Sequence, residues 1–233
     1  MYSVSNLWKS LVAAENHYFE YKARIAGTDY PENRITGGSI DMLMLAGNQP
    51  SVGGCFSGKL TLALLAPTGP IPRMAKIVPY VRVTDGIQTA EWIPQGRFYI
   101  DTRETSANDD GLPILSLVAY DAMLRTEADY PDTSHNWPFL DILVVQEIAA
   151  TIGVEVDPRT ADIMTKGYMI GLPAGYSMRE VLGNIGAMYA GNWIITYDEK
   201  LLLIPINGIP RETNYLVTGA GDAITFGGCR ILV

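Results

Sequence analysis

Apolar and polar residues alternate along the first half of the chain, with the two-residue period of half-buried strands. In residues 17–27, "HYFEYKARIAG", apolar side chains occupy one face and charged side chains occupy the other. The stretches "RITGGSIDMLMLAG", "GKLTLALLA" and "AKIVPYVRVT" continue the pattern, and Asp85–Gly86 after the last of them is typical of a tight turn. Gly37–Gly38, and later Pro94 and Gly96, interrupt the strands, which predicts bulges or an edge position there. Many short strands separated by turns predict a β-barrel or a β-sandwich.

The period becomes helical after about residue 121. Ser177 and Glu180 have the spacing of a capping box, and the apolar residues after them follow one helical stripe. Residues 137–154 predict another helix, and "NWIITYDEKLLLIPI" predicts a hairpin that turns near Asp198–Glu199. The last segment returns to short strands. The pattern therefore predicts an α+β protein in which a β-rich part precedes a small unit of two helices and a hairpin.

Composition narrows the class of protein. The 233 residues are 48% hydrophobic and 18% charged, which is typical of a globular chain. The net charge is −8 and the basic residues are scattered, which disfavours nucleic-acid binding through a basic stripe. No apolar run approaches the roughly 20 residues of a membrane span, so the sequence predicts no membrane-spanning helix. Two cysteines, Cys55 and Cys229, are too few for a disulfide framework, and we expect free thiols.

No motif predicts catalysis. The stretch from Gly53 to Lys59 is similar to a phosphate-binding loop, but Leu60 stands where that loop needs Ser or Thr, and a strand pattern follows instead of a helix. We interpret it as a glycine-rich turn that leads into a strand. The two histidines, His17 and His135, belong to no metal-ligand cluster. Ser134 and Asp132 lie near His135, but adjacency in sequence does not create the geometry of a catalytic triad. We therefore predict no catalytic residue, no metal site and no cofactor.

The order of several segments resembles a known family. The segments are "VRVTDGIQTAEWIPQGRFYIDTRE", "LVAYDAMLRTEADYP", "WPFLDILVVQEIAATIGV" and "GYSMREVLGNIGAMYAGNWIITYDEKLLLIPI". Together they resemble the front part of phage tail baseplate hub or tail-tip proteins, including the N-terminal structural region of tail-associated lysins. The resemblance covers most of the chain and carries no catalytic signature, so it implies that this chain is not an enzyme.

The resemblance implies a domain organisation and a place in the virion. Residues 1–125 would form a first β-barrel, 126–206 an α/β insert, and 207–233 the beginning of a second barrel in a longer protein. Three subunits would form a hub ring that joins the tail tube, or a distal tail protein, above to a spike or fibre below. DNA would pass through the ring without specific binding. The protein would be assembled in the bacterial host cytoplasm and would act in the phage tail.

The segment Val78–Thr102 is our candidate for contacts with a neighbouring subunit or with the channel. Its candidate residues are Arg82, Trp92, Arg97 and Tyr99. One alternative is a carbohydrate-binding β module that uses Trp92 or Trp137 as a stacking platform. A second alternative is an enzyme whose site assembles from distant loops.

Overall fold

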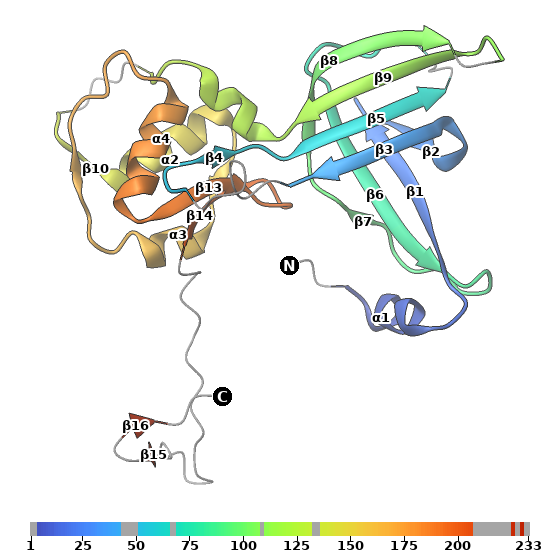
Figure 1. Cartoon of the computed structure of the whole chain (residues 1–233), viewed down its shortest axis with the longest axis horizontal. Helices are drawn as coiled ribbons and strands as arrows, with labels where there is room; N and C mark the ends of the chain where they lie inside the picture. The colour runs from blue at the N-terminus through green and yellow to red at the C-terminus, as the bar shows by residue number, and fades with distance from the viewer. Residues whose placement is uncertain are drawn as a thin grey trace.

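The computed structural model describes residues 4–42, 51–65, 69–107, 110–131 and 136–206, together with short strands at 225–226 and 229–230. Two β-sheets lie side by side in this part of the chain, and three helices pack around the second sheet (Figure 1). The class is α+β, as the sequence predicts. The predicted second barrel falls almost wholly outside the described residues, where only the strand pair β15 (Thr225–Phe226) and β16 (Cys229–Arg230) is seen.

The first sheet has eight strands, and all of its described pairings are antiparallel. The strands follow the order β2-β1-β6-β8-β9-β5-β3, and β7 also pairs with β6. Their bounds are β1 Tyr18–Ile25, β2 Thr28–Pro31, β3 Ile35–Asp41, β5 Lys59–Leu65, β6 Lys76–Thr84, β7 Ile93–Pro94, β8 Phe98–Ala107 and β9 Pro113–Tyr120. A 3₁₀ helix, η1 (Glu32–Arg34), links β2 to β3. Among the described strands β2 and β3 do not pair, so this sheet is open and is not the closed barrel that we expected.

The predicted irregularities of the first sheet are confirmed. The register of β3 against β5 shifts between Ile35 and Gly37, where the glycine pair predicts a bulge. Around Pro94 and Gly96 the return strand divides into β7 and β8, because proline cannot donate to the ladder and Gly96 has a φ of +114°. The glycine-rich stretch before Lys59 leads into strand β5, as we interpreted it.

One face of the first sheet holds its hydrophobic core. Ala23 and Ile25 of β1 lie with Leu62 of β5, Ile77 of β6 and Leu117 of β9, and all five are almost fully buried. Helix α1 (Asn6–Ala13) packs separately, and its Leu11 lies with Val83 near the C-terminal end of strand β6. The alternating pattern of the sequence therefore marks the core face correctly along these strands.

The second sheet has the order β11-β14-β13-β4. Its strands are β11 Glu155–Val156, β14 Lys200–Pro205, β13 Gly191–Ile195 and β4 Cys55–Phe56. Around it lie the helices α2 Asp141–Ile152, α3 Pro158–Ile163 and α4 Met178–Met188, the 3₁₀ helix η2 Ala122–Glu127, and the strand pair β10 Phe139–Leu140 and β12 Met169–Ile170. The capping box of Ser177 and Glu180 and the β13–β14 hairpin are confirmed. The prediction of two helices is wrong, because α3 begins at an Asp157 cap followed by Pro158 and makes a third.

Strand β4 belongs to the second sheet, although β5, the next strand in the sequence, belongs to the first sheet. It comes from the glycine-rich stretch before β5, yet it pairs in parallel with β13 of the second sheet. Gly53 has a φ of +77°, and a side chain there would meet the Gly183 carbonyl oxygen of α4 at 2.8 Å. Two glycines thus let the loop touch the helix backbone. The domain boundary at residue 125 stays a prediction. Strand β4 precedes that boundary in the sequence, yet it lies in the second sheet.

Candidate functional site

The four candidate residues of Val78–Thr102 separate into two pairs. Arg82 and Trp92 form the first pair, on the face of the first sheet opposite its core. Arg82 lies across from Glu20 in the β1–β6 register, and its Nε donates to the Glu20 carboxylate at 2.5 Å. The Arg82 guanidinium lies 4.4 Å from the centroid of the Trp92 ring, and the Lys22 ammonium lies 4.9 Å from it. These are cation–π contacts on a partly exposed surface.

Arg97 and Tyr99 form the second pair, at the junction between the two sheets. Both donate to Glu199, which lies in the turn between β13 and β14: Arg97 Nη1 reaches Oε2 at 2.6 Å, and the Tyr99 hydroxyl bonds Oε1. Lys76 Nζ donates to the same Oε2 at 3.2 Å. The Arg125 guanidinium lies 4.0 Å from the centroid of the Tyr99 ring. Three donors from the first sheet therefore converge on one carboxylate of the second.

The electrostatics of Glu199 follow from this convergence. Burial alone would raise the pKa of its carboxyl, but the bonds from Tyr99, Arg97 and Lys76 outweigh burial and hold the pKa below its usual range. Burial, together with the bond to Glu199, raises the pKa of Tyr99. Glu199 also has a φ of +66°, a conformation that non-glycine residues seldom adopt. The ionised carboxylate thus acts as an acceptor that ties the β13–β14 turn to the first sheet.

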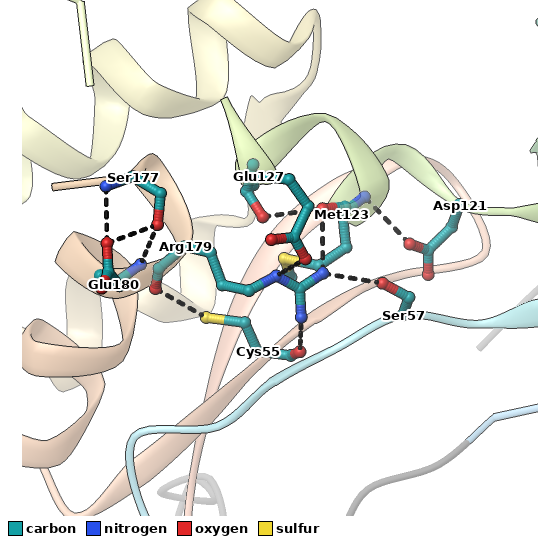
Figure 2. Close-up of polar contacts among 9 residues, drawn as sticks. Cys55, Ser57, Asp121, Met123, Glu127, Ser177, Arg179 and Glu180 are labelled. Atoms are coloured by element: carbon teal, nitrogen blue, oxygen red, sulfur yellow. Dashed lines mark hydrogen bonds and ion pairs between the residues drawn. The ribbon is translucent and has the colours of Figure 1, made fainter. Parts of the chain in front are cut away.

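A second junction, which the sequence analysis missed, surrounds Arg179 at the start of α4. Figure 2 shows its guanidinium lying between β4 and η2. Nη1 donates to the Cys55 carbonyl at 2.6 Å, Nη2 reaches the Met123 carbonyl at 3.3 Å, and Nε lies 2.6 Å from the Glu127 carboxylate. The Cys55 thiol donates back to the Arg179 carbonyl at 3.5 Å. No local pattern marks this arginine, because its partners are more than 50 residues away.

Asp121 directly follows β9 and makes a further contact between distant segments of the chain. Its buried carboxylate accepts the Gly58 N–H at 2.6 Å and the Met123 N–H at 3.0 Å. Burial raises its pKa to about 7, against the lowering effect of these two bonds and of nearby Arg179. The partners of the carboxylate are backbone groups of the chain, so its geometry serves to hold the loop before β5 against η2.

Two observations concern the Cys55 thiol and the metal-ligand side chains in the part of the chain that is described. Burial raises the pKa of the Cys55 thiol to about 12, so the thiol stays protonated at neutral pH. Across the described ranges, no group of three or more His, Cys, Asp and Glu side chains could hold a metal ion. His135 lies outside them.

The tryptophans of the carbohydrate alternative are engaged within the chain. Two cations lie over the Trp92 ring, as described above. The Trp137 ring makes edge contacts with Tyr130 and Phe139, at centroid distances of 6.2 and 6.0 Å, and packs against the core of the second sheet. A sugar-stacking platform needs a free ring face, and these contacts reduce what either ring can offer.

An apolar groove lies in the opening of the first sheet. Its volume is about 480 Å³, and it is lined by β1 and β6 on one side and by β3 and β5 on the other. Ile40, Leu60 and Val81 contribute apolar side chains, and Gly37 and Gly38 leave one wall as bare backbone. The groove surface is mainly apolar, which suits apolar groups or an extended chain, although Lys22, Glu32 and Tyr80 also line it.

The fold is similar to those of two tail proteins of known structure. One is the 43 kDa tail protein of prophage MuSo2 from Shewanella oneidensis, with a TM-score of 0.57 and 13% sequence identity over 90% of this chain and 61% of that one. The other is a tail protein from Neisseria meningitidis MC58, with a TM-score of 0.52 and 11% identity over 82% of this chain and 52% of that one. The chain thus spans only about half to three fifths of their lengths.

Sequence comparison adds no assignment to this likeness of fold. No family model matches the sequence, and none of the curated proteins matches it. Within the part of the chain that is described, no helix is long and apolar enough to cross a membrane.

Proposed function

We propose that this chain is a structural component of a phage or prophage tail. In this proposal it forms a trimeric hub ring that joins the tail tube to the tail tip or spike and lets DNA pass. A tube or distal tail protein binds above the ring, a spike or fibre binds below it, and the ring itself carries no enzymatic activity. The protein is assembled in the bacterial cytoplasm and acts in the virion.

The likeness of fold to two tail proteins is the observation that carries the proposal. It extends over 90% and 82% of this chain. A fold alone does not determine function. The order of segments noted in the sequence points independently to the same class of protein.

The charge distribution is compatible with a channel for DNA. The chain carries a net charge of −8. Several cations near its surface are already paired with carboxylates, among them Lys22, Arg24, Arg82 and Arg97. DNA is held when free lysines and arginines displace its counterions. A surface whose cations are neutralised in this way would let the genome slide past.

The two junctions suit a structural role. Glu199 collects bonds from the first sheet and fixes the second sheet against it, and Arg179 joins α4 to β4 and η2 around the second sheet. A subunit that transmits force between a tube and a tip benefits from such a connection, because relative motion of the two sheets would break several bonds at once.

The experiment that tests the proposal is localisation in particles. Tailed particles are purified from a strain that carries the gene, labelled with an antibody against the 233-residue chain, and quantified by mass spectrometry. We expect label at the tube–tip junction and three copies per tail, and a strain without the gene should assemble no complete tails. Intact tails that lack the chain would refute the proposal. Specific glycan binding by the purified chain, lost in Trp92→Ala, would favour the carbohydrate alternative instead.

A further inference from the structure

The first sheet and the second unit share little packed surface. The second unit is the second sheet together with η2, α2, α3 and α4, and Figure 1 shows it beside the first sheet. Each part has its own hydrophobic core, and among the described strands of the first sheet only Tyr99 belongs to the core of the second unit. Across the described elements, no extensive helix or strand packing joins the two parts. Relative motion is the ordinary expectation for parts that share so small an interface.

Two short links carry the described chain from one part to the other. One is Ser57–Gly58, between β4 and β5, and the other is the single residue Asp121, between β9 and η2. The links are bonded to each other: the Gly58 N–H donates to the Asp121 carboxylate at 2.6 Å, and the Asp121 N–H donates to the Gly58 carbonyl at 3.1 Å. A Cβ at position 58 would lie 3.0 Å from that carboxylate, so glycine permits the approach. We call this bonded pair the pivot, because hinges consist of a few residues at the ends of elements.

The Glu199 carboxylate makes a second connection between the two parts. It accepts bonds from Arg97 at 2.6 Å, from Lys76 at 3.2 Å and from the Tyr99 hydroxyl, and we call these four residues the latch. All three donors share one acceptor, so movement of Glu199 releases them together. The Arg97 and Lys76 side chains are 44% and 41% exposed, so water can replace Glu199 at both cations without unfolding of either core.

The pivot and the latch lie beside each other along one end of the first sheet. The strand order there is β6-β8-β9-β5, and one register row runs through Lys76, Tyr99, Tyr120 and Lys59. The pivot follows β9 and precedes β5, whereas the donors of the latch lie at the start of β8 and β6. Neighbouring strands are about 4.8 Å apart, so the two connections are separated by only a few strand spacings. Release of the latch thus frees one side of the interface while the other side stays bonded.

We propose that the Glu199 latch is a releasable contact that keeps the second unit closed against the first sheet, and that its release lets the second unit rotate about the Gly58–Asp121 pivot. Each core lies within one part and keeps its packing during the rotation, and Tyr99 alone leaves the core of the second unit. The inference does not depend on the proposed place in a tail, because all of its contacts lie within one chain.

Single-molecule energy transfer between two dyes on the whole chain tests the rotation. The dyes are attached to Glu104→Cys in β8 and Asp162→Cys in α3, two exposed positions on different parts, in a Cys229→Ser background. Burial raises the pKa of the Cys55 thiol to about 12, so Cys55 reacts little with the dyes. We expect one main transfer efficiency for this chain. Glu199→Ala should raise the fraction of molecules at a second efficiency at least about tenfold, because buried Tyr99 loses a charged acceptor.

Two further variants check that the latch is responsible. Asp198→Asn is the matched control, because Asp198 bonds Thr196 and Lys200 of its own hairpin, and it should leave the distribution unchanged within about twofold. Tyr99→Phe removes the donor from the other side of the latch and keeps the ring, so it should populate the same second efficiency. Combined with Glu199→Ala it should add little, because both changes remove the same bond. If Glu199→Ala does not fold, Tyr99→Phe provides the deciding comparison with Asp198→Asn.

Hydrogen exchange distinguishes rotation from partial unfolding and locates the pivot. In Glu199→Ala the amides of β5, β9, β13 and β14 should keep their protection within about threefold, because both cores stay packed. The Gly58 and Asp121 amides should stay protected as well, since each donates across the pivot.

Each opposite result would overturn the inference. A distribution that Glu199→Ala leaves unchanged, or that Asp198→Asn alters equally, contradicts a latch at Glu199. Loss of protection in either core contradicts rotation of intact parts, and loss of protection at Gly58 and Asp121 contradicts a pivot there. The proposed function is judged separately, by the presence of the chain in tails.

Discussion

Replacing Glu199 by alanine should weaken the junction between the two sheets measurably. The substitution leaves Tyr99, Arg97 and Lys76 without their common acceptor. Alanine and glutamate are both strained at this left-handed φ. The difference in stability therefore reports the loss of the Glu199 carboxylate and its bonds. The control is Asp198→Asn in the same turn, because the Asp198 side chain is 54% exposed and bonds Thr196 and Lys200 of its own hairpin.

The magnitude follows from the exposure of the three partners. Tyr99 is a buried residue whose hydroxyl loses a charged acceptor, which costs about 1.5–3 kcal/mol. The Arg97 and Lys76 side chains are 44% and 41% exposed, so water screens both ion pairs and each contributes at most about 0.2–1 kcal/mol. We therefore expect Glu199→Ala to lower the free energy of unfolding by about 2–5 kcal/mol, and Asp198→Asn to lower it by less than about 1 kcal/mol.

Urea unfolding at pH 7 and at acid pH provides the assay. The folded-state pKa of Glu199 is depressed, so its contribution is present above the ordinary value of 4.5 and is lost as the pH falls through the folded pKa. The difference between the unmodified chain and Glu199→Ala should thus shrink at acid pH. A double-mutant cycle with Tyr99→Phe should give a coupling of about 0.5–3 kcal/mol. Equal stability of Glu199→Ala and Asp198→Asn, or no coupling, would refute the reasoning.

Three further predictions concern contacts inside the chain. The folded Asp121 has a pKa raised to about 7 against 3.8 when unfolded, so stability should fall as the pH rises between those values, and Asp121→Asn should flatten this part of a stability–pH curve. Gly53→Ala should lower the melting temperature more than Gly27→Ala does. Both glycines have a positive φ, but a new Cβ at Gly53 would meet a backbone oxygen at 2.8 Å, whereas a Cβ at Gly27 would face open space. Trp193→Phe should cost about 1–3 kcal/mol, because the buried Leu182 carbonyl would lose the indole N–H that now lies 2.6 Å away; equal stability would contradict this.

Local patterns allowed much of the fold to be predicted. The alternation of β1 and β5, the Asp85–Gly86 turn and the Ser177–Glu180 capping box depend on residues within a few positions of one another, and all are found in the structure. Helix α3 was missed because six residues are too few for a helical period to show. Its only signals were the Asp157 cap and the proline after it.

The junctions could not be predicted, because they depend on contacts between distant segments. Strand β4 has two residues, and nothing in them indicates a partner about 140 residues later. Arg179 and Glu199 lie in unremarkable local contexts, and only the folded chain brings their partners together. Of the four candidate contact residues, the structure places Arg82 beside Trp92, and it places Arg97 beside Tyr99 at Glu199. Their predicted contacts with a subunit or channel stay predictions.

Cryo-electron microscopy of intact tails tests the central claim most directly. The account predicts density for three copies of this fold around the channel, at the junction between the tail tube and the tip. A tail map in which every density at that junction belongs to other proteins would contradict the account.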